Sequence, residues 1–182
     1  ALYELGLISN RSGNVSGRLE GSEHFWITPT RMCKPELTPE LLVKLDLQGR
    51  IIEGKVSPSR EKLMHARIYQ TKKEINAVVH AHNPLVLALV ASGIPFCPET
   101  VEAKLNINPT LVSPKPPGSP ELAEVVSNAV QEDYNLVIIP RHGVIAVGQD
   151  LLEARAIAET AEMEAKFLLV FTLLKKMRYV DY

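Results

Sequence analysis

The sequence predicts an α/β fold, in which helices are layered against a sheet. Short apolar and β-branched runs of strand length alternate along the chain with longer segments that begin with helix-start signals. The 182 residues suffice for one full hydrophobic core but hardly for two, so we expect a single domain over residues 1–182. The content of 46% hydrophobic and 23% charged residues is ordinary for a globular protein.

Strand and helix signals in the first half of the chain follow turn and cap residues. In order, we expect a strand over residues 24–28, a short helix that begins at Thr38-Pro39-Glu40, a hairpin or bend over residues 43–53 around Gln48-Gly49, a helix capped by Ser59 that runs to about residue 73, and a β-branched strand over residues 75–82.

The second half continues the alternation. A helix over residues 84–92 ends at Gly93, and Ser119 as N-cap with Pro120 at the first position begins a helix over residues 120–131. Two apolar strands, over residues 136–139 and 144–147, are joined by Pro140-Arg-His-Gly143. Asp150 with Glu153 resembles a capping box and begins a long helix over about residues 151–176.

The composition restricts the partners and the compartment. A formal net charge of -1 gives no general attraction to nucleic acid or to an anionic membrane, so any anion binding has to be local. Cys33 and Cys97 form neither a C-x-x-C pair nor a disulfide framework, so we expect two buried thiols in a reducing cytoplasm. Residues 1–10 lack the pattern of a signal peptide, and the apolar tract at residues 167–174 is too short to span a membrane, so we expect a soluble protein.

Two histidines provide the strongest local signal for chemistry. His80 and His82 lie two apart on an expected strand, where their side chains point to the same face and can bind one metal ion together. The alternative is a pair of strand-end histidines whose needs are met by hydrogen bonds. His142, in a tight Arg-His-Gly turn, would present a third imidazole at a sheet edge, and a turn residue with an unusual backbone is the alternative there. His24 and His65 receive no role, and we expect His65 to be partly buried.

Three polar segments suit the binding of a phosphate. Ser12-Gly-Asn-Val-Ser16, Thr28-Pro-Thr-Arg31 and Ser57-Pro-Ser-Arg60 each stand beside an expected strand end or helix start, where backbone N–H groups and hydroxyls are free, although each alone is an ordinary turn. Glu61 follows the third segment. In the first turn of a helix it is favourable for electrostatic reasons alone, but beside a metal it could act as a fourth ligand or as a general base. The sequence has no P-loop, no G-x-G-x-x-G after a strand and no G-x-S-x-G, so nucleotide binding has no support.

Five motifs, taken in order, resemble those of a known family. Gly13-Asn-Val-Ser16, Ile27-Thr-Pro-Thr30, Pro58-Ser-Arg-Glu61, His80-Ala-His82 and Arg141-His-Gly143 are similar to the motif series of the class II aldolase and adducin head family. The resemblance implies a central, mainly antiparallel sheet layered with helices. It also implies that Zn²⁺ or another divalent transition metal is held by His80, His82, His142 and Glu61, and that a substrate phosphate is bound by Gly13, Asn14, Thr30 and Ser59, with Arg60 as a further candidate.

The resemblance further implies a lyase that acts on small phosphorylated sugars. An aldolase of this family cleaves a ketose 1-phosphate, such as L-fuculose 1-phosphate, to dihydroxyacetone phosphate and an aldehyde through a metal-stabilised enediolate, with Glu61 shuttling the proton. A glutamate at this position, where the epimerases have an aspartate, favours C–C bond chemistry. The alternatives are a decarboxylase, a dehydratase or a 4-epimerase with the same metal site, and a non-catalytic adducin-like scaffold, against which the four retained metal ligands argue.

The chain departs from the aldolase pattern beside the expected substrate. Arg31 replaces a glycine and Arg60 replaces a second serine, and the planar fork of either guanidinium could grip a phosphate or a substrate carboxylate. The aldolases also use a tyrosine of the next subunit as proton donor, and the matching segment after Ile94-Pro95 has none. Glu102, and less readily Glu99, is the candidate replacement, with a surface glutamate on a short helix as the alternative.

The resemblance has consequences for the assembly and for the two ends of the chain. Relatives are usually homotetramers with sites between subunits, and we expect the same assembly here. Relatives also carry most of a helix before the first motif, so we expect that the N-terminus is trimmed. Tyr179 and Tyr182 resemble the aromatic tail that closes over the aldolase site, and neither receives a role.

Overall fold

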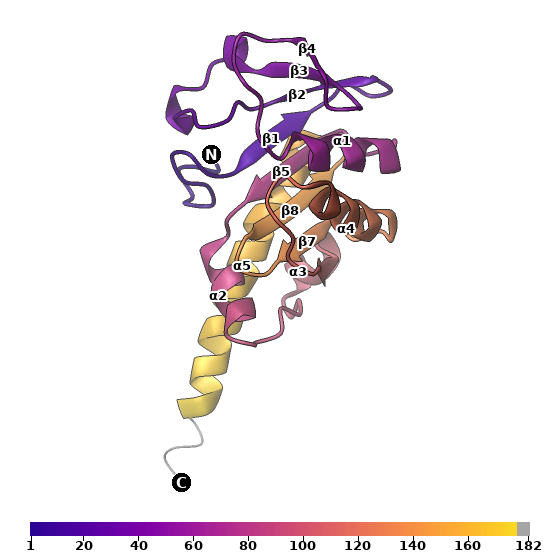
Figure 1. Cartoon of the computed structure of the whole chain (residues 1–182). Helices are drawn as coiled ribbons and strands as arrows, with labels where there is room; N and C mark the ends of the chain where they lie inside the picture. The colour runs from indigo at the N-terminus through magenta and orange to yellow at the C-terminus, as the bar shows by residue number, and fades with distance from the viewer. Residues whose placement is uncertain (178–182) are drawn as a thin grey trace.

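A computed structural model of the chain, described here for residues 1–177, is built on one eight-stranded sheet (Figure 1). The order across the sheet is β4-β3-β2-β1-β5-β8-β7-β6. All neighbouring strands are antiparallel except β6 and β7, which are parallel. The strands are β1 (Asn14–Gly17), β2 (His24–Ile27), β3 (Val43–Asp46), β4 (Ile51–Glu53), β5 (Ala77–Ala81), β6 (Pro109–Leu111), β7 (Leu136–Ile139) and β8 (Gly143–Gly148).

Helices cover both faces of this sheet. One face is packed against α1 and α4, and the other against α2 and α5. The C-terminal half of α5 extends beyond the other described elements (Figure 1). The helices of the described residues are α1 (Lys62–Thr71), α2 (Pro84–Ala91), α3 (Val101–Asn106), α4 (Pro120–Gln131) and α5 (Leu151–Met177), with two 3₁₀ turns, η1 (Lys34–Glu36) and η2 (Pro39–Leu41).

The alternation of side chains along the central strands divides the hydrophobic core into two clusters. On β5, Ala77, Val79 and Ala81 pack in the cluster with α2 and α5, whereas Val78 packs in the cluster with α1 and α4. His80 shares the parity of Val78. It therefore faces the side of the sheet that α1 covers, and α1 is the helix that Glu61 immediately precedes.

The structure confirms the α/β fold with a central, mainly antiparallel sheet, and most of the expected elements. The expected hairpin is β3 and β4, joined by a turn in which Gly49 has a positive φ of 76°. The cap of α4 is as expected, because Ser119 Oγ accepts a hydrogen bond from the Leu122 N–H at 3.1 Å. The start of α5 is also as expected, since Asp150 Oδ1 accepts from the Glu153 N–H at 2.8 Å.

Two local expectations are wrong. Ser59 does not cap the first helical turn: its hydroxyl accepts from the Glu61 N–H at 3.2 Å, and α1 begins only at Lys62, so that Glu61 itself is the N-cap residue. The cysteines are not buried thiols, because Cys97 is exposed and Cys33 is half-buried. Both lie in loops, where the surrounding chain covers them incompletely.

Two strands were not expected from the sequence, and the short helix α3 was named only in the alternative for Glu102. The strand β1 falls in a segment interpreted as a polar loop, yet it is paired on both sides, by β2 and by β5, so that the side chains of Asn14 and Ser16 are buried. The strand β6 has only three residues, and α3 has six, with Thr100 Oγ1 accepting from the Ala103 N–H at its start. Elements this short, or with polar buried faces, carry little hydrophobic periodicity.

Within residues 1–177, no helix has both the length and the apolar character that crossing a bilayer requires. Tyr179 and Tyr182, the candidate aromatic tail, lie outside the described residues.

Candidate active site

Three histidines converge at one end of the central strands. His80 is the fourth residue of β5 and His82 directly follows this strand, while His142 directly precedes β8. The antiparallel register that pairs Ala81 with Val144 brings the β7–β8 turn beside the end of β5. One ring nitrogen from each of the three histidines lies within 4.8 Å of the others.

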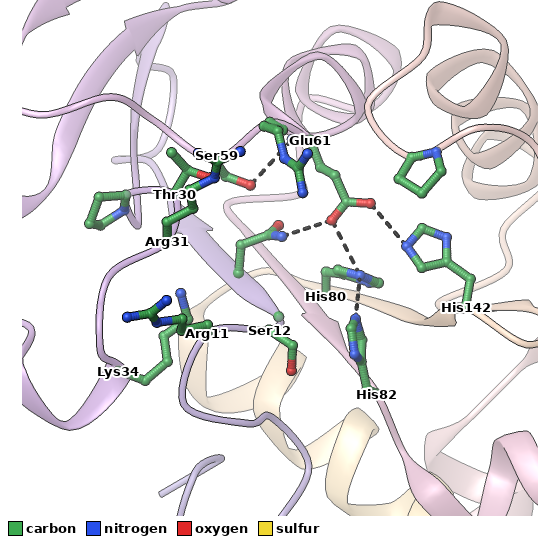
Figure 2. Close-up of a pocket in the computed structure, with 15 residues that line it drawn as sticks. Arg11, Ser12, Thr30, Arg31, Lys34, Ser59, Glu61, His80, His82 and His142 are labelled. Carbon is green, nitrogen blue, oxygen red and sulfur yellow. Dashed lines mark hydrogen bonds and ion pairs between the residues drawn. The ribbon is translucent and has the colours of Figure 1, made fainter.

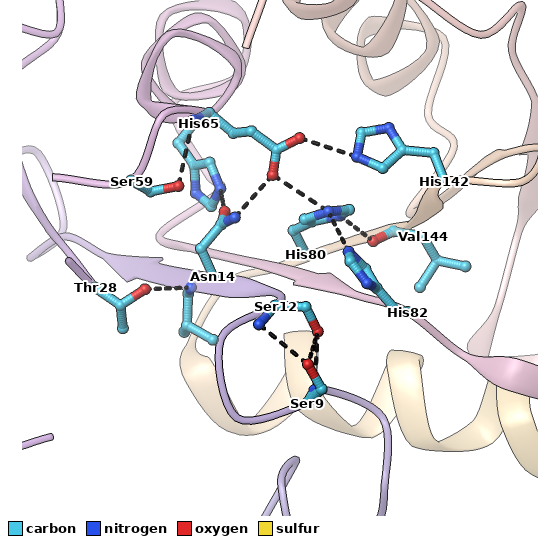
Figure 3. A network of polar contacts seen from close by, with 12 residues as sticks. Ser9, Ser12, Asn14, Thr28, Ser59, His65, His80, His82, His142 and Val144 are labelled. Carbon is cyan, nitrogen blue, oxygen red and sulfur yellow. Dashed lines mark hydrogen bonds and ion pairs between the residues drawn. The ribbon is translucent and has the colours of Figure 1, made fainter. Parts of the chain in front are cut away.

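The hydrogen bonds of His80 fix which of its nitrogens is free. The Nδ1–H of this buried ring donates to the carbonyl oxygen of Val144 at 3.0 Å, so Nε2 carries the lone pair. That Nε2 lies 3.1 Å from Nε2 of His82 (Figure 3). Two ring nitrogens aimed at one point, with the tautomer fixed from behind by a backbone carbonyl, are the arrangement that suits a divalent transition metal.

Gly143 permits this close packing. A Cβ atom at position 143 would lie 2.5 Å from Cε1 of His80 and 2.6 Å from the carbonyl oxygen of Ala81, distances at which atoms overlap. At position 143, the first residue of β8, only glycine therefore fits without displacing the imidazole of His80.

The carboxylate of Glu61 faces the three histidines from the start of α1. Its Oε2 lies 3.2 Å from His80 Nε2, and its Oε1 lies 3.2 Å from His142 Nε2 (Figure 2). Asn14 Nδ2 donates a further hydrogen bond to Oε2 at 2.8 Å. This position, at hydrogen-bonding distance from two of the histidine nitrogens, fits a fourth ligand.

The electrostatics of this group favour an ionised glutamate and the neutral forms of His80 and His82. Burial alone would raise the pKa of Glu61, but the hydrogen bond with His142, the electrostatic interaction with the His80 imidazole and the Asn14 amide together hold it well below its usual range. Burial lowers the pKa of His80 to about 4, and it also lowers the pKa of His82. Neutral imidazoles beside a carboxylate are the protonation states that metal ligation requires.

A cavity of about 330 Å³ opens beside this cluster (Figure 2). Its lining brings together nearly all of the site residues expected from the sequence, namely Gly13, Asn14, Thr30, Ser59, Arg60, Glu61, His80, His82 and His142. Long-range pairing unites the loops involved: the Ser59 N–H donates to the carbonyl of Thr28 at 3.1 Å, and the Thr30 N–H donates to that of Ser57 at 3.0 Å. Gly13 has a positive φ of 72°, and a Cβ there would lie 2.4 Å from Ile8 Cγ2.

Four cationic side chains line the same cavity. Arg31 and Arg60 were singled out from the sequence, whereas Arg11 and Lys34 were not, because nothing in the sequence around them distinguishes them from the other cations. Arg31 has a positive φ of 57°, a conformation that glycine adopts without strain and that costs other residues about 1 kcal/mol. The backbone at this position therefore keeps the conformation that suits the glycine of the aldolase pattern.

Glu102 is the expected site residue that the structure does not bring into the cavity of its own chain. It lies exposed on α3, and the described lining of the cavity does not include it. The start of α3 is held firmly, because the buried carboxylate of Glu164 accepts from the Glu99 N–H at 2.6 Å and from the Thr100 hydroxyl at 2.6 Å. Glu99 lies 3.3 Å from Lys104 in an exposed ion pair.

His65 is fully buried, not partly buried as expected. It lies one helical turn after Glu61, and it contacts Asn14 and Ser16, which are two apart on β1. In the sequence, only the spacing of four residues between Glu61 and His65 indicates that their side chains lie on the same face of the helix.

Comparison with known proteins agrees with the fold. The family described as Class II Aldolase and Adducin N-terminal domain matches residues 1–169. The chain belongs to this family. Membership implies a lyase, and the His80, His82 and His142 group could hold the divalent metal that class II aldolases use.

Individual members of the family carry different names. The chain is 35% identical over 175 residues to an L-fuculose phosphate aldolase of Methanococcus maripaludis, covering 96% of this chain and 93% of that protein. It is 34% identical over 191 residues to a 3-oxo-tetronate 4-phosphate decarboxylase of Haemophilus influenzae, covering 99% of this chain and 87% of that protein. The crystal structure of L-fuculose-1-phosphate aldolase from Thermus thermophilus superposes with a TM-score of 0.85 at 32% identity, over 96% of this chain and 90% of the other.

Proposed function

We propose that the chain is a metal-dependent aldolase that cleaves a ketose 1-phosphate, such as L-fuculose 1-phosphate, to dihydroxyacetone phosphate and an aldehyde. One observation carries the proposal: the carboxylate of Glu61 meets His80 and His142 in the wall of a cavity that also holds the anion-binding segments at Gly13, Thr30 and Ser59. A phosphate in those segments places the carbon chain of a small sugar next to the histidines.

His80, His82 and His142 would hold the metal, Zn²⁺ or another divalent transition metal, with Glu61 as a fourth ligand. A bound divalent metal would supply Lewis-acid stabilisation of the negative charge that develops when the C3–C4 bond breaks. Glu61, displaced from this position by the substrate, would move the proton at the nucleophilic carbon. The low pKa of Glu61 keeps it ionised in the metal-free chain.

The phosphate would be held by neutral groups and by charge. The Gly13 and Thr30 segments offer backbone N–H groups, while Asn14 and Ser59 offer an amide and a hydroxyl in the same lining. Arg60 adds a charge-assisted contact. With a net charge of only -1 on the whole chain, this local set is what attracts the anionic substrate.

Glu102 would act as the proton donor from a neighbouring subunit of a homotetramer. Two observations support this: Glu102 is exposed, and α3 is fixed by Glu164, so the side chain projects from a rigid surface. Mixing the variants Glu61→Gln and Glu102→Gln after subunit exchange tests the arrangement. If the site is shared, random assembly restores about a quarter of the normal sites, whereas a site within one chain gives no recovery.

Product analysis on a panel of ketose 1-phosphates tests the aldolase reaction. Release of dihydroxyacetone phosphate, its loss on treatment with a chelator and its recovery with Zn²⁺ are expected. If no member of the panel releases it, the aldolase proposal fails. Metal analysis of protein purified without chelators separates an enzyme from an adducin-like scaffold, because a scaffold would contain no stoichiometric metal.

A second candidate reaction is the decarboxylation of a phosphorylated sugar acid. The observation that favours it is the presence of four cations, Arg11, Arg31, Lys34 and Arg60, beside a single carboxylate in one cavity. A ketose 1-phosphate carries only its phosphate charge, whereas 3-oxo-tetronate 4-phosphate also carries a carboxylate. In that reaction the bond to the carboxylate breaks, carbon dioxide leaves, and the electron pair remains beside the ketone until the carbon is protonated. The same panel, extended to phosphorylated oxo acids, distinguishes the two by carbon dioxide release.

We also propose a cytoplasmic location. It rests on the free state of Cys33 and Cys97 and on the metabolic class of the substrate.

A further inference from the structure

A series of hydrogen bonds between buried polar side chains, called the hydrogen-bonded chain below, connects Tyr69 in the core to Glu61. Tyr69 Oη lies 2.7 Å from Ser16 Oγ, and Ser16 Oγ lies 2.6 Å from His65 Nδ1. His65 Nε2 lies 2.5 Å from Asn14 Oδ1, and Asn14 Nδ2 donates to Glu61 Oε2 at 2.8 Å (Figure 3). These five side chains come from only two elements and the residue before one of them, namely β1 and the segment from Glu61 into α1.

The ionised carboxylate of Glu61 fixes the direction of every hydrogen bond in this chain. A carboxylate only accepts, so Asn14 must turn its N–H toward Glu61 and its carbonyl oxygen toward His65. His65 must then carry its proton on Nε2 in order to donate. Its Nδ1 is left as an acceptor for the hydroxyl of Ser16, which in turn accepts from the hydroxyl of Tyr69.

We propose that His65 is a positioning residue, which holds the Asn14 amide by donation from Nε2–H and thereby fixes the carboxylate of Glu61 against the metal-binding histidines. The proposal rests on the role of Glu61 in the proposed function. Without the His65 donor, the Asn14 amide is free to rotate, and an Asn14 carbonyl oxygen turned toward the carboxylate would repel it.

The surroundings of the chain are built to keep it rigid. His65, Ser16 and Tyr69 are all at most 2% exposed. The ring of Tyr69 is stacked below the guanidinium of Arg18, at 4.8 Å from Cζ to the ring centroid, and packs against Phe25 at 5.1 Å between centroids. Arg18 also donates to the carbonyl oxygen of Tyr69 at 3.2 Å. The Tyr69 end of the hydrogen-bonded chain is therefore anchored in the core.

Burial supports the neutral form of His65 that the chain requires. Desolvation lowers the pKa of His65 to about 3 and outweighs the opposing effect of the Glu61 charge. The ring is thus uncharged at neutral pH. A charged imidazolium would have to donate from both nitrogens, and it would then force the Ser16 hydroxyl to donate to Tyr69.

Two substitutions of similar size separate positioning from packing. In His65→Gln the amide nitrogen can take the place of Nε2 and still donate to Asn14, whereas in His65→Asn the shorter amide reaches only the place of Nδ1. Both remove the ring, so both lose comparable packing. We expect His65→Asn to lower kcat and Zn²⁺ affinity about 10-fold each, and His65→Gln to stay within about threefold of the unmodified protein, as a conservative replacement of the donor.

The readouts are kcat and KM, Zn²⁺ affinity by competition with a chromophoric chelator, and urea unfolding of both variants. If the two variants lose kcat and affinity equally, in step with their lost stability, His65 has a packing role only and the proposal is wrong. If the unmodified protein cleaves no sugar phosphate but the two variants still differ in Zn²⁺ affinity as stated, the proposed function fails and the positioning role stands.

The tautomer of His65 can be measured in the unmodified protein, so this test does not depend on the folding of a variant. Nitrogen NMR of ¹⁵N-histidine-labelled protein, with His65 assigned, distinguishes a ring protonated on Nε2 from one protonated on Nδ1 or on both. Protonation on Nε2 alone is expected between about pH 6 and pH 8, because the low pKa of His65 keeps the ring neutral at these pH values. The Nδ1–H form or the imidazolium would overturn the proposal.

Discussion

Gly143 and His80 are so close that no side chain fits between them: a Cβ on residue 143 would lie 2.5 Å from Cε1 of the imidazole. The contact joins the two parts of the histidine cluster, because His80 belongs to β5 and Gly143 begins β8 directly after His142. The distance between the two histidine-bearing segments is therefore set by the size of residue 143.

Replacing Gly143 with alanine should push His80 away from the other two histidines. We expect Gly143→Ala to lower the free energy of unfolding by roughly 1–3 kcal/mol, as overpacking of a core usually does, and to weaken Zn²⁺ binding at least about 10-fold. The matched control is Gly17→Ala on β1, where a Cβ would make only an ordinary contact at 3.6 Å with Leu151. Equal metal affinity in the two variants would show that the close packing is irrelevant to the site.

Metal binding should stabilise the folded protein by an amount that grows with the logarithm of the free metal concentration above the Kd. At free Zn²⁺ about 100 times the Kd, the gain is about 2.7 kcal/mol, measurable as a rise in Tm. His82→Asn should abolish most of this gain, since it removes one of the three ligands, whereas His24→Asn, outside the cluster, should keep it. The prediction fails if chelator and Zn²⁺ give the same Tm in the unmodified protein.

Glu61→Gln should leave a folded, metal-binding protein with little activity. The three histidines remain, and glutamine keeps the size and one acceptor of the glutamate, but it cannot accept a proton as a base. We expect kcat to fall by about 100-fold or more. Zn²⁺ content and Tm provide the check on folding, and Glu124→Gln, exposed on α4, is the control for loss of a surface charge. Turnover close to normal would remove Glu61 from the catalytic role.

Acid should destabilise the metal-free protein partly through His65. Its pKa is about 3 in the folded state against 6.5 for an unperturbed histidine, so between these values the unfolded state binds a proton that the folded state does not. Stability from this group is therefore complete above pH 6.5 and is lost as the pH falls toward 3. Between pH 7 and pH 5 the loss is about 2 kcal/mol.

Urea unfolding of the unmodified protein and of His65→Gln at the two pH values isolates this contribution. His80 titrates in both proteins, so the difference between the two pH dependences belongs to position 65. We expect the unmodified protein to lose more stability on acidification than the variant does. Identical losses would mean that His65 has the same pKa in the folded and unfolded states, which would contradict its low folded pKa.

Arg31 and Arg60 should determine whether the protein prefers a substrate with one anionic group, the phosphate, or a substrate with both a phosphate and a carboxylate. The double variant Arg31→Gly, Arg60→Ser restores the pattern of the aldolases and removes two of the four cations of the cavity. If these arginines bind a carboxylate, kcat/KM for a phosphorylated oxo acid should fall about 10-fold or more relative to that for a ketose 1-phosphate, since charge-assisted hydrogen bonds contribute 1.5–3 kcal/mol in rough terms. Arg67→Ser, an exposed cation on α1, is the control. An unchanged ratio would assign both arginines to the phosphate or to no substrate group.

Some features were predictable because their signals are local. The start of α4 is set by Ser119 and Pro120, and that of α5 by Asp150 with Glu153, and both caps form as expected. The parity of a strand places His80 and His82 on one side whatever the strand pairs with. Motif order then supplied the family, and with it the sheet that the structure confirms.

The strand β1 shows why other features could not be predicted. Its buried residues Asn14 and Ser16 are polar, so it lacks the apolar alternation that identifies a strand, and only its pairing with β2 and β5 makes it one. The burial of His65 follows from the same cause, because its partners come from that strand.

The sequence by itself determined the candidate ligands, Glu61, His80, His82 and His142, and the segments suited to a phosphate. The tertiary structure decided that Glu61 meets His80 and His142 at 3.2 Å, that four cations share one cavity, and that Glu102 lies outside it. These relationships join residues far apart in the chain, such as Asn14 and Glu61, and they depend on the order of strands in the sheet. Local residue patterns carry no record of that order, whereas the folded chain is defined by it.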